Sequence, residues 1–342
     1  VDALMEEAGL DVLLVTSKHN IQYLTGGHRH PFFDYADAIG VSRYLPVLVY
    51  EKGRPDHAAY IANRNEGDAI AAHRREHGFW PPTVVTGASG TVEAMRLALD
   101  HVGKIGADER RIGVEKAFLP ADAAELLAGF RVAEALRPLE LLRACKTQRE
   151  LGLLREASDL VVDAMLAVIA GHGPGSTKRQ LAEALRRAET DRGLIFEYCL
   201  ITPGTGLQRS PSDEVWRAGD ILSLDSGGNY RGYIGDLCRM AILGEADAEL
   251  EDLLGEVDAI QQAARGVIRA GLSGGDVYAP AEARLKASPH AKDLRFVAHG
   301  MGLVSHEAPR LTATGPVPYP ASDADRPLEV GMVLSIETTL LH

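Results

Sequence analysis

The pattern of apolar and polar positions over the first 140 residues predicts an α/β domain. Short apolar runs, typical of buried strands, lie at 11–16, 45–51, 57–62, 111–115 and 131–135. Helical spacing of apolar residues among good helix formers lies at 63–77, 92–102 and 120–129. Because strands that alternate with helices usually form a parallel sheet covered by helices, we expect a mostly parallel sheet here. The first apolar run leads into VTSKHN, which lacks a glycine-rich phosphate loop, so the pattern carries no dinucleotide signature.

A region with a different pattern follows. A helix is predicted over 148–169, and Ser176 or Thr177 can cap a second helix that ends near residue 192. The remaining predicted elements are strands at 195–202, 221–226 and 232–243 and a helix at 247–270. We therefore divide the chain into an α/β N-terminal domain, residues 1–140, and a second domain, residues 141–342. Two helix-then-strand units in the second domain suggest an internal duplication, although no repeat is visible in the sequence.

Composition and charge narrow the class of protein. The 342 residues are 46% hydrophobic and 25% charged, which is ordinary for a folded globular chain and excludes disorder over its whole length. The net charge of −12, without a clustered basic face, argues against nucleic-acid and anionic-membrane partners. No apolar run approaches the ~20 residues of a membrane span, and the first residues form no signal core. Three distant cysteines, Cys145, Cys199 and Cys238, predict a reduced cytoplasmic protein with buried thiols.

Residues 221–243 read as a β-hairpin, because two alternating apolar runs flank the glycine-rich stretch around Gly227. A turn centred between residues 230 and 231 would place Asp225 directly opposite Asp236, with Cβ atoms about 5 Å apart. Two carboxylates so placed in an apolar sheet repel, so that one takes up a proton or a cation lies between them. The alternative is a pair of solvated turn aspartates.

Two further segments place titratable side chains among apolar neighbours. In FVAHGMGLVSHEAPR, His299 follows an apolar strand, and glycines beside it let backbone approach a ligand closely. His306 comes seven residues later, and the pair is compatible with ligands or with structural histidines. In LEVGMVLSIET, Glu337 is predicted at the end of a strand, where alone it would reach solvent.

A second histidine pair matches a short zinc-protease pattern. His73 and His77 of HRREH are four residues apart on a predicted helix and could chelate a metal. The arginines between them instead indicate a charged, solvated helix face, which is the reading we favour.

The three segments from 221 to 338 together resemble the pita-bread metallohydrolases: methionine aminopeptidases, proline-specific peptidases and creatinase. That family shows two Asp separated by ten residues on a hairpin, as in LDSGGNYRGYIGDLCR, then a glycine-flanked His with a HE.P segment, and then a Glu after GMVLSI. LRACKTQRELGLLREA resembles the start of the catalytic domain. GLDVLLVTSKHNIQYLTG resembles the N-terminal domain of the prolidase and creatinase branch, so the resemblance covers nearly the whole chain. It implies that a pita-bread α+β catalytic domain follows the α/β domain in the sequence.

The resemblance also implies roles for individual residues. Asp225, Asp236, His299 and Glu337 correspond to ligands of a centre with two divalent metal ions, and such a donor set suits Mn, Co, Zn or Fe. Glu337 would also be catalytic, as the proton acceptor for the attacking water. His306, which is not a ligand in the family, would be catalytic by donating to the oxyanion or the leaving nitrogen. The family's fifth ligand is a Glu on a later strand, so we expect the C-terminal end to be missing from a chain that stops five residues after Glu337.

One departure from the family concerns the substrate side of the site. The peptidases usually have a His twelve residues before the Asp of the GD pair that precedes the first metal strand, and this chain has Gln208 there, beside Arg209. Glutamine cannot exchange a proton near neutral pH. Arg209 could hold a substrate carboxylate or could be a solvent-facing loop residue. Gln208, Arg209 and His299 are the residues we expect to contact substrate.

The function expected from these features is hydrolysis of a short peptide, most directly one with proline after the scissile bond. One alternative is creatinase-like C–N hydrolysis of a small non-peptide, and another is a non-catalytic binding protein on the same fold. The resembling branch forms homodimers in which N-terminal loops can wall the partner's site. We therefore expect a homodimer in which the apolar, aromatic loop at residues 28–34 lies near an active-site mouth.

Overall fold

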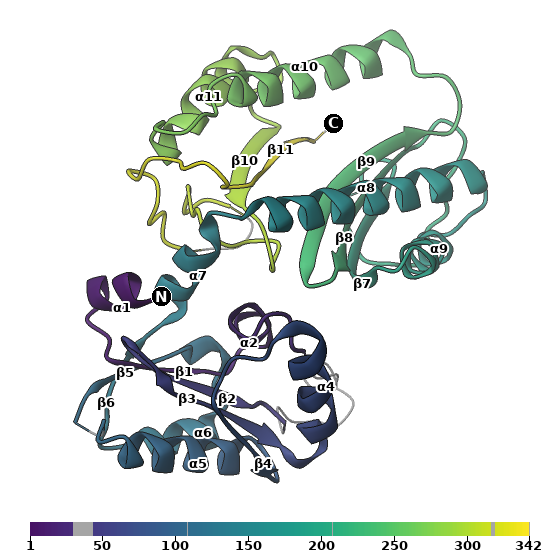
Figure 1. The fold of residues 1–342 in the computed structure, drawn as a ribbon. Helices are drawn as coiled ribbons and strands as arrows, with labels where there is room; N and C mark the ends of the chain where they lie inside the picture. The colour runs from purple at the N-terminus through teal and green to yellow at the C-terminus, as the bar shows by residue number, and fades with distance from the viewer. Residues whose placement is uncertain (30–43, 108, 207, 316–318, 342) are drawn as a thin grey trace. The chain divides into compact units, whose positions relative to one another are not determined.

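The computed structural model describes residues 1–29, 44–107, 109–206, 208–315 and 319–341. The chain divides into two compact units, Val1–Leu142 and Arg143–His342, each with its own hydrophobic core (Figure 1). Among the described residues, no helix is long and apolar enough to cross a membrane. Of the three free cysteines, only Cys199 is buried, so the expectation of buried thiols is wrong for Cys145 and Cys238.

A six-stranded sheet forms the centre of the first unit, in the order β4-β3-β2-β1-β5-β6. The strands are β1 (Val12–Val15), β2 (Val47–Glu51), β3 (Arg54–Asn63), β4 (Thr83–Ala88), β5 (Arg111–Val114) and β6 (Arg131–Glu134). The pairings β1/β5, β5/β6 and β3/β4 are parallel, whereas β2 is antiparallel to both of its neighbours. Only Lys52 and Gly53 separate β2 from β3, and so short a connection permits antiparallel pairing alone. The sheet is therefore mixed.

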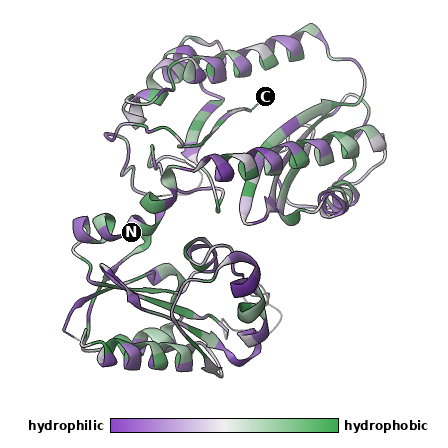
Figure 2. Cartoon of the chain, in the orientation of Figure 1, coloured by the Kyte–Doolittle hydropathy of each residue, from purple (hydrophilic) through white to green (hydrophobic). Residues whose placement is uncertain are grey.

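Helices cover this sheet and complete its core. They are α1 (Asp2–Glu7), α2 (Lys18–Leu24), α4 (Gly67–His77), α5 (Thr91–Lys104), α6 (Ala121–Ala124) and α7 (Leu136–Ala144), with short 3-10 turns η2 (Arg64–Glu66), η3 (Lys116–Phe118) and η4 (Glu125–Leu127). On α5, Ala94, Met95, Ala98 and Val102 recur at helical spacing and are all fully buried in the core. In Figure 2 the strands of this sheet are mostly green, which marks hydrophobic residues, whereas its helices carry both green and purple, hydrophilic residues.

The histidines at 73 and 77 lie on α4, and among the described residues they join no cluster of three metal-ligating groups. His73 Nε2 lies 3.3 Å from the Thr25 carbonyl oxygen, and burial lowers the pKa of His73. The His77 side chain is 59% exposed. Within the described ranges, the zinc-protease pattern therefore has no third ligand.

The loop expected near an active-site mouth lies mostly outside the described residues, which resume at Tyr44. His28 at its start is buried, and its Nε2 lies 3.3 Å from Glu66 Oε2. The homodimer and the position of this loop stay predictions.

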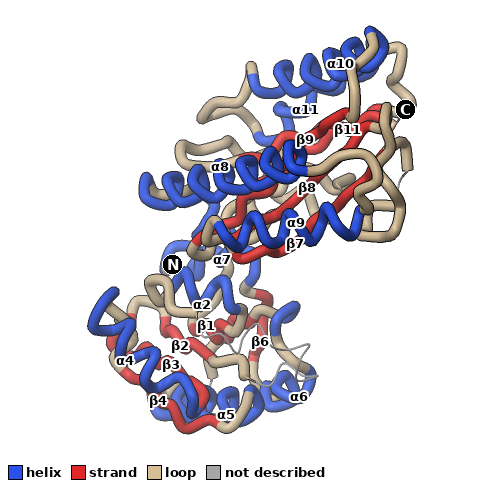
Figure 3. The backbone as a smooth tube through the Cα atoms, turned by 90° about the vertical axis from the view of Figure 1, so that its right-hand side faces the viewer, coloured by secondary structure: helices blue, strands red, loops and turns tan. Residues whose placement is uncertain are grey.

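The second unit repeats one arrangement twice, with a helix pair packed on an antiparallel sheet each time. Helices α8 (Gln148–Gly171) and α9 (Lys178–Asp191) pack on β7 (Ile195–Pro203), β8 (Ile221–Tyr230) and β9 (Tyr233–Ile242) (Figure 3). Helices α10 (Ala248–Arg265) and α11 (Tyr278–Ala287), with η5 (Gly274–Val277) before α11, pack on β10 (Leu294–Gly300) and β11 (Leu334–Leu340). Thr147, Thr177 and Asp247 cap α8, α9 and α10 through their side chains.

The turn of the β8–β9 hairpin lies one residue later in the chain than predicted. Tyr230 pairs with Tyr233, so the turn residues are Arg231 and Gly232, both with positive φ as a two-residue hairpin turn of type I′ requires. Asp225 therefore faces Cys238, and Asp236 faces Gly227, so the two aspartates are not directly opposite as predicted. The offset amounts to two residues, and side chains alternate with a period of two, so both carboxylates still share one face as diagonal neighbours.

The glycines expected in the turn lie within β8, where close packing explains them. A Cβ on Gly228 would come within 3.0 Å of Glu189 Oε2 and 2.7 Å of Val161. Glu189 is fully buried behind β8, where Ser226 Oγ lies 2.8 Å from its Oε1. Its Oε2 has no hydrogen-bond partner among the described groups. Burial raises the pKa of Glu189 to about 7.

This carboxyl should make stability depend on pH. Since the folded pKa lies above the ordinary 4.5, the fold holds a proton that the unfolded chain has released, and stability falls as pH rises from about 4.5 through 7. Glu189→Gln cannot ionise and should gain about 3 kcal/mol over the wild type between pH 4.5 and 8. Urea unfolding at several pH values measures this, with Glu156→Gln, which removes an exposed carboxylate on α8, as control. A constant difference between Glu189→Gln and wild type across that range would show that Glu189 does not titrate in it.

Candidate metal centre

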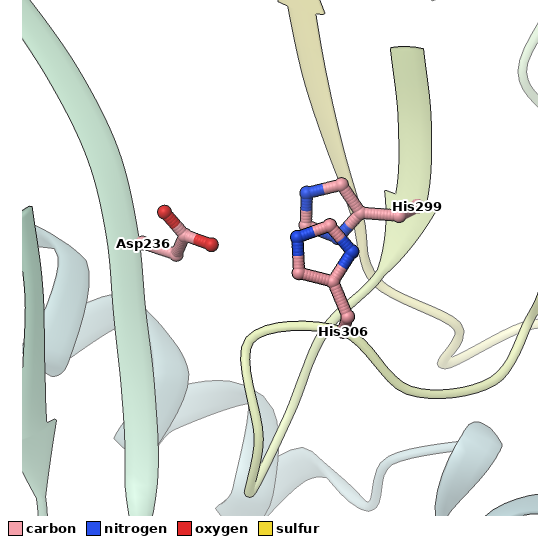
Figure 4. Close-up of side chains that lie close together, drawn as sticks. All are labelled: Asp236, His299 and His306. Atoms are coloured by element: carbon pink, nitrogen blue, oxygen red, sulfur yellow. The ribbon is translucent and has the colours of Figure 1, made fainter. Parts of the chain in front are cut away.

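Four strands of the second unit bring together the residues that the sequence proposed as ligands. Asp225 lies on β8, Asp236 on β9, His299 on β10 and Glu337 on β11. Figure 4 shows Asp236 facing the imidazoles of His299 and His306 across a gap between the two sheets. Polar side chains from elements far apart in sequence thus converge on one volume.

His299 and Glu337 form a tight pair across β10 and β11. His299 pairs with Ser335 and Val297 with Glu337, so the two site residues are diagonal neighbours, as Asp225 and Asp236 are on the other sheet. Glu337 lies inside β11, so its predicted place at the strand end is wrong. His299 Nε2 lies 2.9 Å from Glu337 Oε1, which also accepts from Ser335 Oγ at 3.2 Å. Although burial opposes ionisation, this hydrogen bond lowers the pKa of Glu337 and raises the pKa of His299.

His306 stacks on His299 and completes a group of three possible ligands. The ring centroids are 3.7 Å apart and the planes meet at 15°. One ligand atom each from Asp236, His299 and His306 lies within 4.8 Å of the others. Burial and the neighbouring His299 lower the pKa of His306 to about 4, so its imidazole is neutral near pH 7. Its Nδ1 is buried and has no hydrogen-bond partner in the described structure.

Tyr198 on β7 is a site residue that sequence reasoning missed. Across the sheet, Tyr198, Gly227 and Asp236 form one row, and the Tyr198 hydroxyl hydrogen-bonds the Asp236 carboxylate. A Cβ on Gly227 would lie 2.3 Å from the tyrosine ring, so the ring can cross β8 only over a glycine. Burial raises the pKa of Asp236 to about 6, against this hydrogen bond. The glycines Gly227 and Gly228 in β8 were the available sequence signal for this close packing, but they were interpreted as part of a turn.

The substrate-side residues Gln208 and Arg209 take up different positions. Gln208 is exposed, and its Oε1 accepts from the Ser210 backbone N–H at 2.7 Å. The buried ammonium of Lys178 donates to the Gln208 carbonyl oxygen. Arg209 Nη2 forms an ion pair with Asp225 Oδ2. The Gln208 side chain therefore bonds within its own loop, whereas the Arg209 side chain contacts the candidate ligand Asp225.

The donor set fits divalent metal ions. Three carboxylates and an imidazole form an oxygen-rich, hard site of the kind that Mn, Fe, Co or Zn occupies. His299 Nδ1 lies 3.2 Å from the Gly300 carbonyl oxygen, which fixes the ring and leaves Nε2 for an ion. Burial raises the pKa of Asp225, a cost that a bound cation would offset.

A buried ion triad beside His306 was also missed. Glu307 Oε2 lies 3.1 Å from Arg143 Nη2, and Glu307 Oε1 lies 3.0 Å from Lys146 Nζ, with all three side chains at most 1% exposed. A Cβ on Gly302 would lie 2.1 Å from Glu307 Oε1, so the close approach requires glycine. The triad ties the segment that carries His306 to residues more than 160 positions earlier.

Glu307→Gln should destabilise the protein by about 3–5 kcal/mol, because it removes the negative charge that two buried cations share. Chemical unfolding measures the loss, and Glu329→Gln, which removes an exposed carboxylate, is the control. Adding Lys146→Met to Glu307→Gln should recover part of the loss, since it removes one of the cations. Equal stability of Glu307→Gln and wild type would contradict the role of the triad.

Comparison with known proteins identifies the family of both parts of the chain. The model of metallopeptidase family M24 matches residues 152–342, and that of the creatinase/prolidase N-terminal domain matches residues 1–145. The uncharacterized peptidase YqhT of Bacillus subtilis is 23% identical over 98% of this chain and 87% of its own length. The probable dipeptidase PepE of Mycobacterium tuberculosis is 30% identical over 58% of this chain and 52% of its own length. The agropine synthesis cyclase of Rhizobium rhizogenes is 25% identical over 97% and 85%.

Solved structures share the fold over almost the whole chain. A dipeptidase from Pyrococcus horikoshii has a TM-score of 0.80 at 21% identity, covering 99% of this chain and 89% of that chain. An Xaa-Pro dipeptidase from Bacillus anthracis has a TM-score of 0.76 at 22% identity, covering 97% and 86%. The pita-bread fold and the prolidase/creatinase branch predicted from the sequence are confirmed. The chain belongs to metallopeptidase family M24 and carries a creatinase/prolidase N-terminal domain.

Proposed function

We propose that this protein is a metal-dependent hydrolase that cleaves short peptides, with dipeptides that have proline after the scissile bond as first-choice substrates. The observation that carries the proposal is the convergence of two carboxylates from β8–β9 on the His299–Glu337 pair of β10–β11. Relatives and fold neighbours named as dipeptidases and Xaa-Pro dipeptidases support a short substrate.

In this proposal, Asp225, Asp236, His299 and Glu337 would hold two divalent ions, which would supply Lewis-acid polarisation and a water of lowered pKa. Glu337 would accept a proton from the attacking water, with its carboxylate oriented by the hydrogen bond from Ser335. The neutral imidazole of His306 donates to the developing oxyanion or the leaving nitrogen. His299 also borders the substrate, through the stack with His306.

The substrate side of the proposal rests on Arg209 and Gln208. Arg209 is the only one of the two whose described contacts reach a proposed ligand, and its guanidinium suits a free substrate carboxylate. A carboxylate preference fits dipeptides and other small acids better than long peptides.

A second candidate function is C–N bond chemistry on a small non-peptide. The similarity to a protein named as a cyclase, at 25% identity over nearly the whole chain, favours keeping it. The third, a binding protein without catalysis, predicts no metal-dependent stabilisation.

The free thiols support a reducing compartment, the cytoplasm.

Hydrolysis of a matched dipeptide panel by protein loaded with Mn, Co or Zn tests these candidates. Xaa-Pro dipeptides should be cleaved faster than the corresponding Xaa-Ala dipeptides and longer Xaa-Pro peptides. Cyclic amides and amidines form the second arm, with Asp236→Asn protein as the blank. Turnover confined to the second arm would replace the peptidase proposal by the small-molecule one. No turnover in either arm, together with no metal-induced rise in melting temperature, would favour the binding protein.

A further inference from the structure

We propose that Arg209 acts as a resident cation at Asp225 and weakens metal binding there, because it competes with a metal ion for that carboxylate. This inference rests on the proposed function for the existence of the metal centre, and it adds a residue that sets how the centre is loaded. Asp225 is the proposed ligand that Arg209 already engages.

Backbone pairing, rather than side-chain length alone, places the guanidinium beside Asp225. The Ile201 N–H donates to the Arg209 carbonyl oxygen at 2.8 Å, so residue 209 lies along the outer edge of β7. Within the sheet, Leu200 pairs with Asp225 on β8. Residue 209 is therefore about two strand spacings from Asp225, a separation that an arginine side chain can cover.

The loop that carries Arg209 is anchored to the start of α9. Lys178, which is fully buried, donates from Nζ to the Gln208 carbonyl oxygen, and its backbone N–H donates to the Glu214 carbonyl oxygen at 2.9 Å. The Arg179 N–H donates to the Ser212 carbonyl oxygen at 2.9 Å. These bonds on both sides of Arg209 hold its backbone in place, so the ion pair needs no further ordering of the loop.

The two halves of the centre differ in charge. Within the described part of the chain, no arginine or lysine forms an ion pair with Asp236 or Glu337, and the cation-capable partner of Glu337 is His299, itself a proposed ligand. At Asp225, by contrast, a permanent positive charge already contacts the carboxylate. An ion that binds there must displace the guanidinium or bear its repulsion, because arginine does not lose its proton in proteins.

Displacement is open to Arg209, because its side chain is 49% exposed and can turn into solvent. The position formed by Asp236, His299 and Glu337 should therefore fill first. The position at Asp225 should fill only at higher metal concentration, with Arg209 released.

Titration calorimetry of the metal-stripped protein with Mn²⁺ tests this without any activity measurement. We expect two classes of site in the wild type. Arg209→Gln should tighten the weaker class by roughly tenfold or more and leave the tighter class within about twofold, since a contacting charge is removed at one position only. Arg209→Lys, which keeps the charge, should stay near the wild type.

The matched control is Arg179→Gln, which removes an equal charge from the same region, where Arg179 pairs with the exposed Asp213. Two equally tight sites in the wild type, or equal effects of Arg209→Gln and Arg179→Gln, would overturn the inference and leave the proposed hydrolase intact. No binding of Mn²⁺ to any of the proteins would overturn both.

Discussion

Asp236→Asn should abolish hydrolysis and remove most of the bound metal. Asp236 is buried and faces His299 and His306, and its carboxylate is the donor from β9 in the proposed centre. Loss of an outer partner of a metal site commonly costs 10–100-fold in affinity or activity, so loss of a ligand should cost more than about 10². Elemental analysis and turnover of an Xaa-Pro dipeptide measure both effects. Asp225→Ala should also abolish hydrolysis but should lower the metal content less, because the position at Asp225 is the weaker one.

The metal-free form separates ligand loss from unfolding. Asparagine is close in shape to aspartate and carries no charge, and burial raises the pKa of Asp236 to about 6, so the charged form costs stability at pH 7.5. The metal-free variant should therefore melt at or above the metal-free wild type, while the rise in melting temperature with Mn²⁺ should disappear. Asp213→Asn, which removes an exposed carboxylate, should change neither quantity. Full metal content and turnover in Asp236→Asn would end the assignment of Asp236 as a ligand.

His306→Ala should lower turnover by roughly 10²–10⁴ while metal content stays the same. The imidazole stacks on His299, is neutral near pH 7 and has a buried Nδ1 without a described partner, as expected of a group that meets its partner only with substrate present. Single-turnover kinetics and elemental analysis on one preparation separate the two readouts. His172→Ala removes a partly buried histidine at the end of α8 and serves as the control.

The position of His306 is also compatible with a role as a metal ligand. One of its ring nitrogens lies within 4.8 Å of a possible ligand atom of Asp236 and of one of His299. Metal loss in His306→Ala, in proportion to the loss of turnover, would make this residue a ligand and reject its role as a donor.

Much of the fold could be predicted because it follows from local periodicity. The strands β1, β2 and β5 and the helices α8 and α9 lie close to the ranges expected from apolar spacing and capping residues. The strand β4 was missed because TVVTGA is short and lies between prolines and a Gly-Ala-Ser-Gly stretch that reads as loop. The helix expected over 120–129 breaks into α6 and the 3-10 turn η4.

The hairpin shows how a register error can leave a site prediction intact. The sequence could not locate the turn, because Arg231, a non-glycine residue, takes a positive φ there. Asp225 and Asp236 nevertheless share a face, because the alternation of side chains is preserved under an even shift.

The sequence by itself determined the order of the candidate ligands along the chain, the hairpin that carries Asp225 and Asp236, and the family to which the chain belongs, because each of these follows from short-range spacing. It placed His299 after a strand, whereas His299 lies inside β10. Only the tertiary structure decided three contacts. The Tyr198 ring passes over Gly227 so that its hydroxyl hydrogen-bonds Asp236, Glu307 forms ion pairs with two buried cations, and Arg209 contacts Asp225. These contacts depend on which strands pair and on how closely backbones approach. No local pattern encodes them, because the partners are brought together by burial of apolar surface elsewhere in the core.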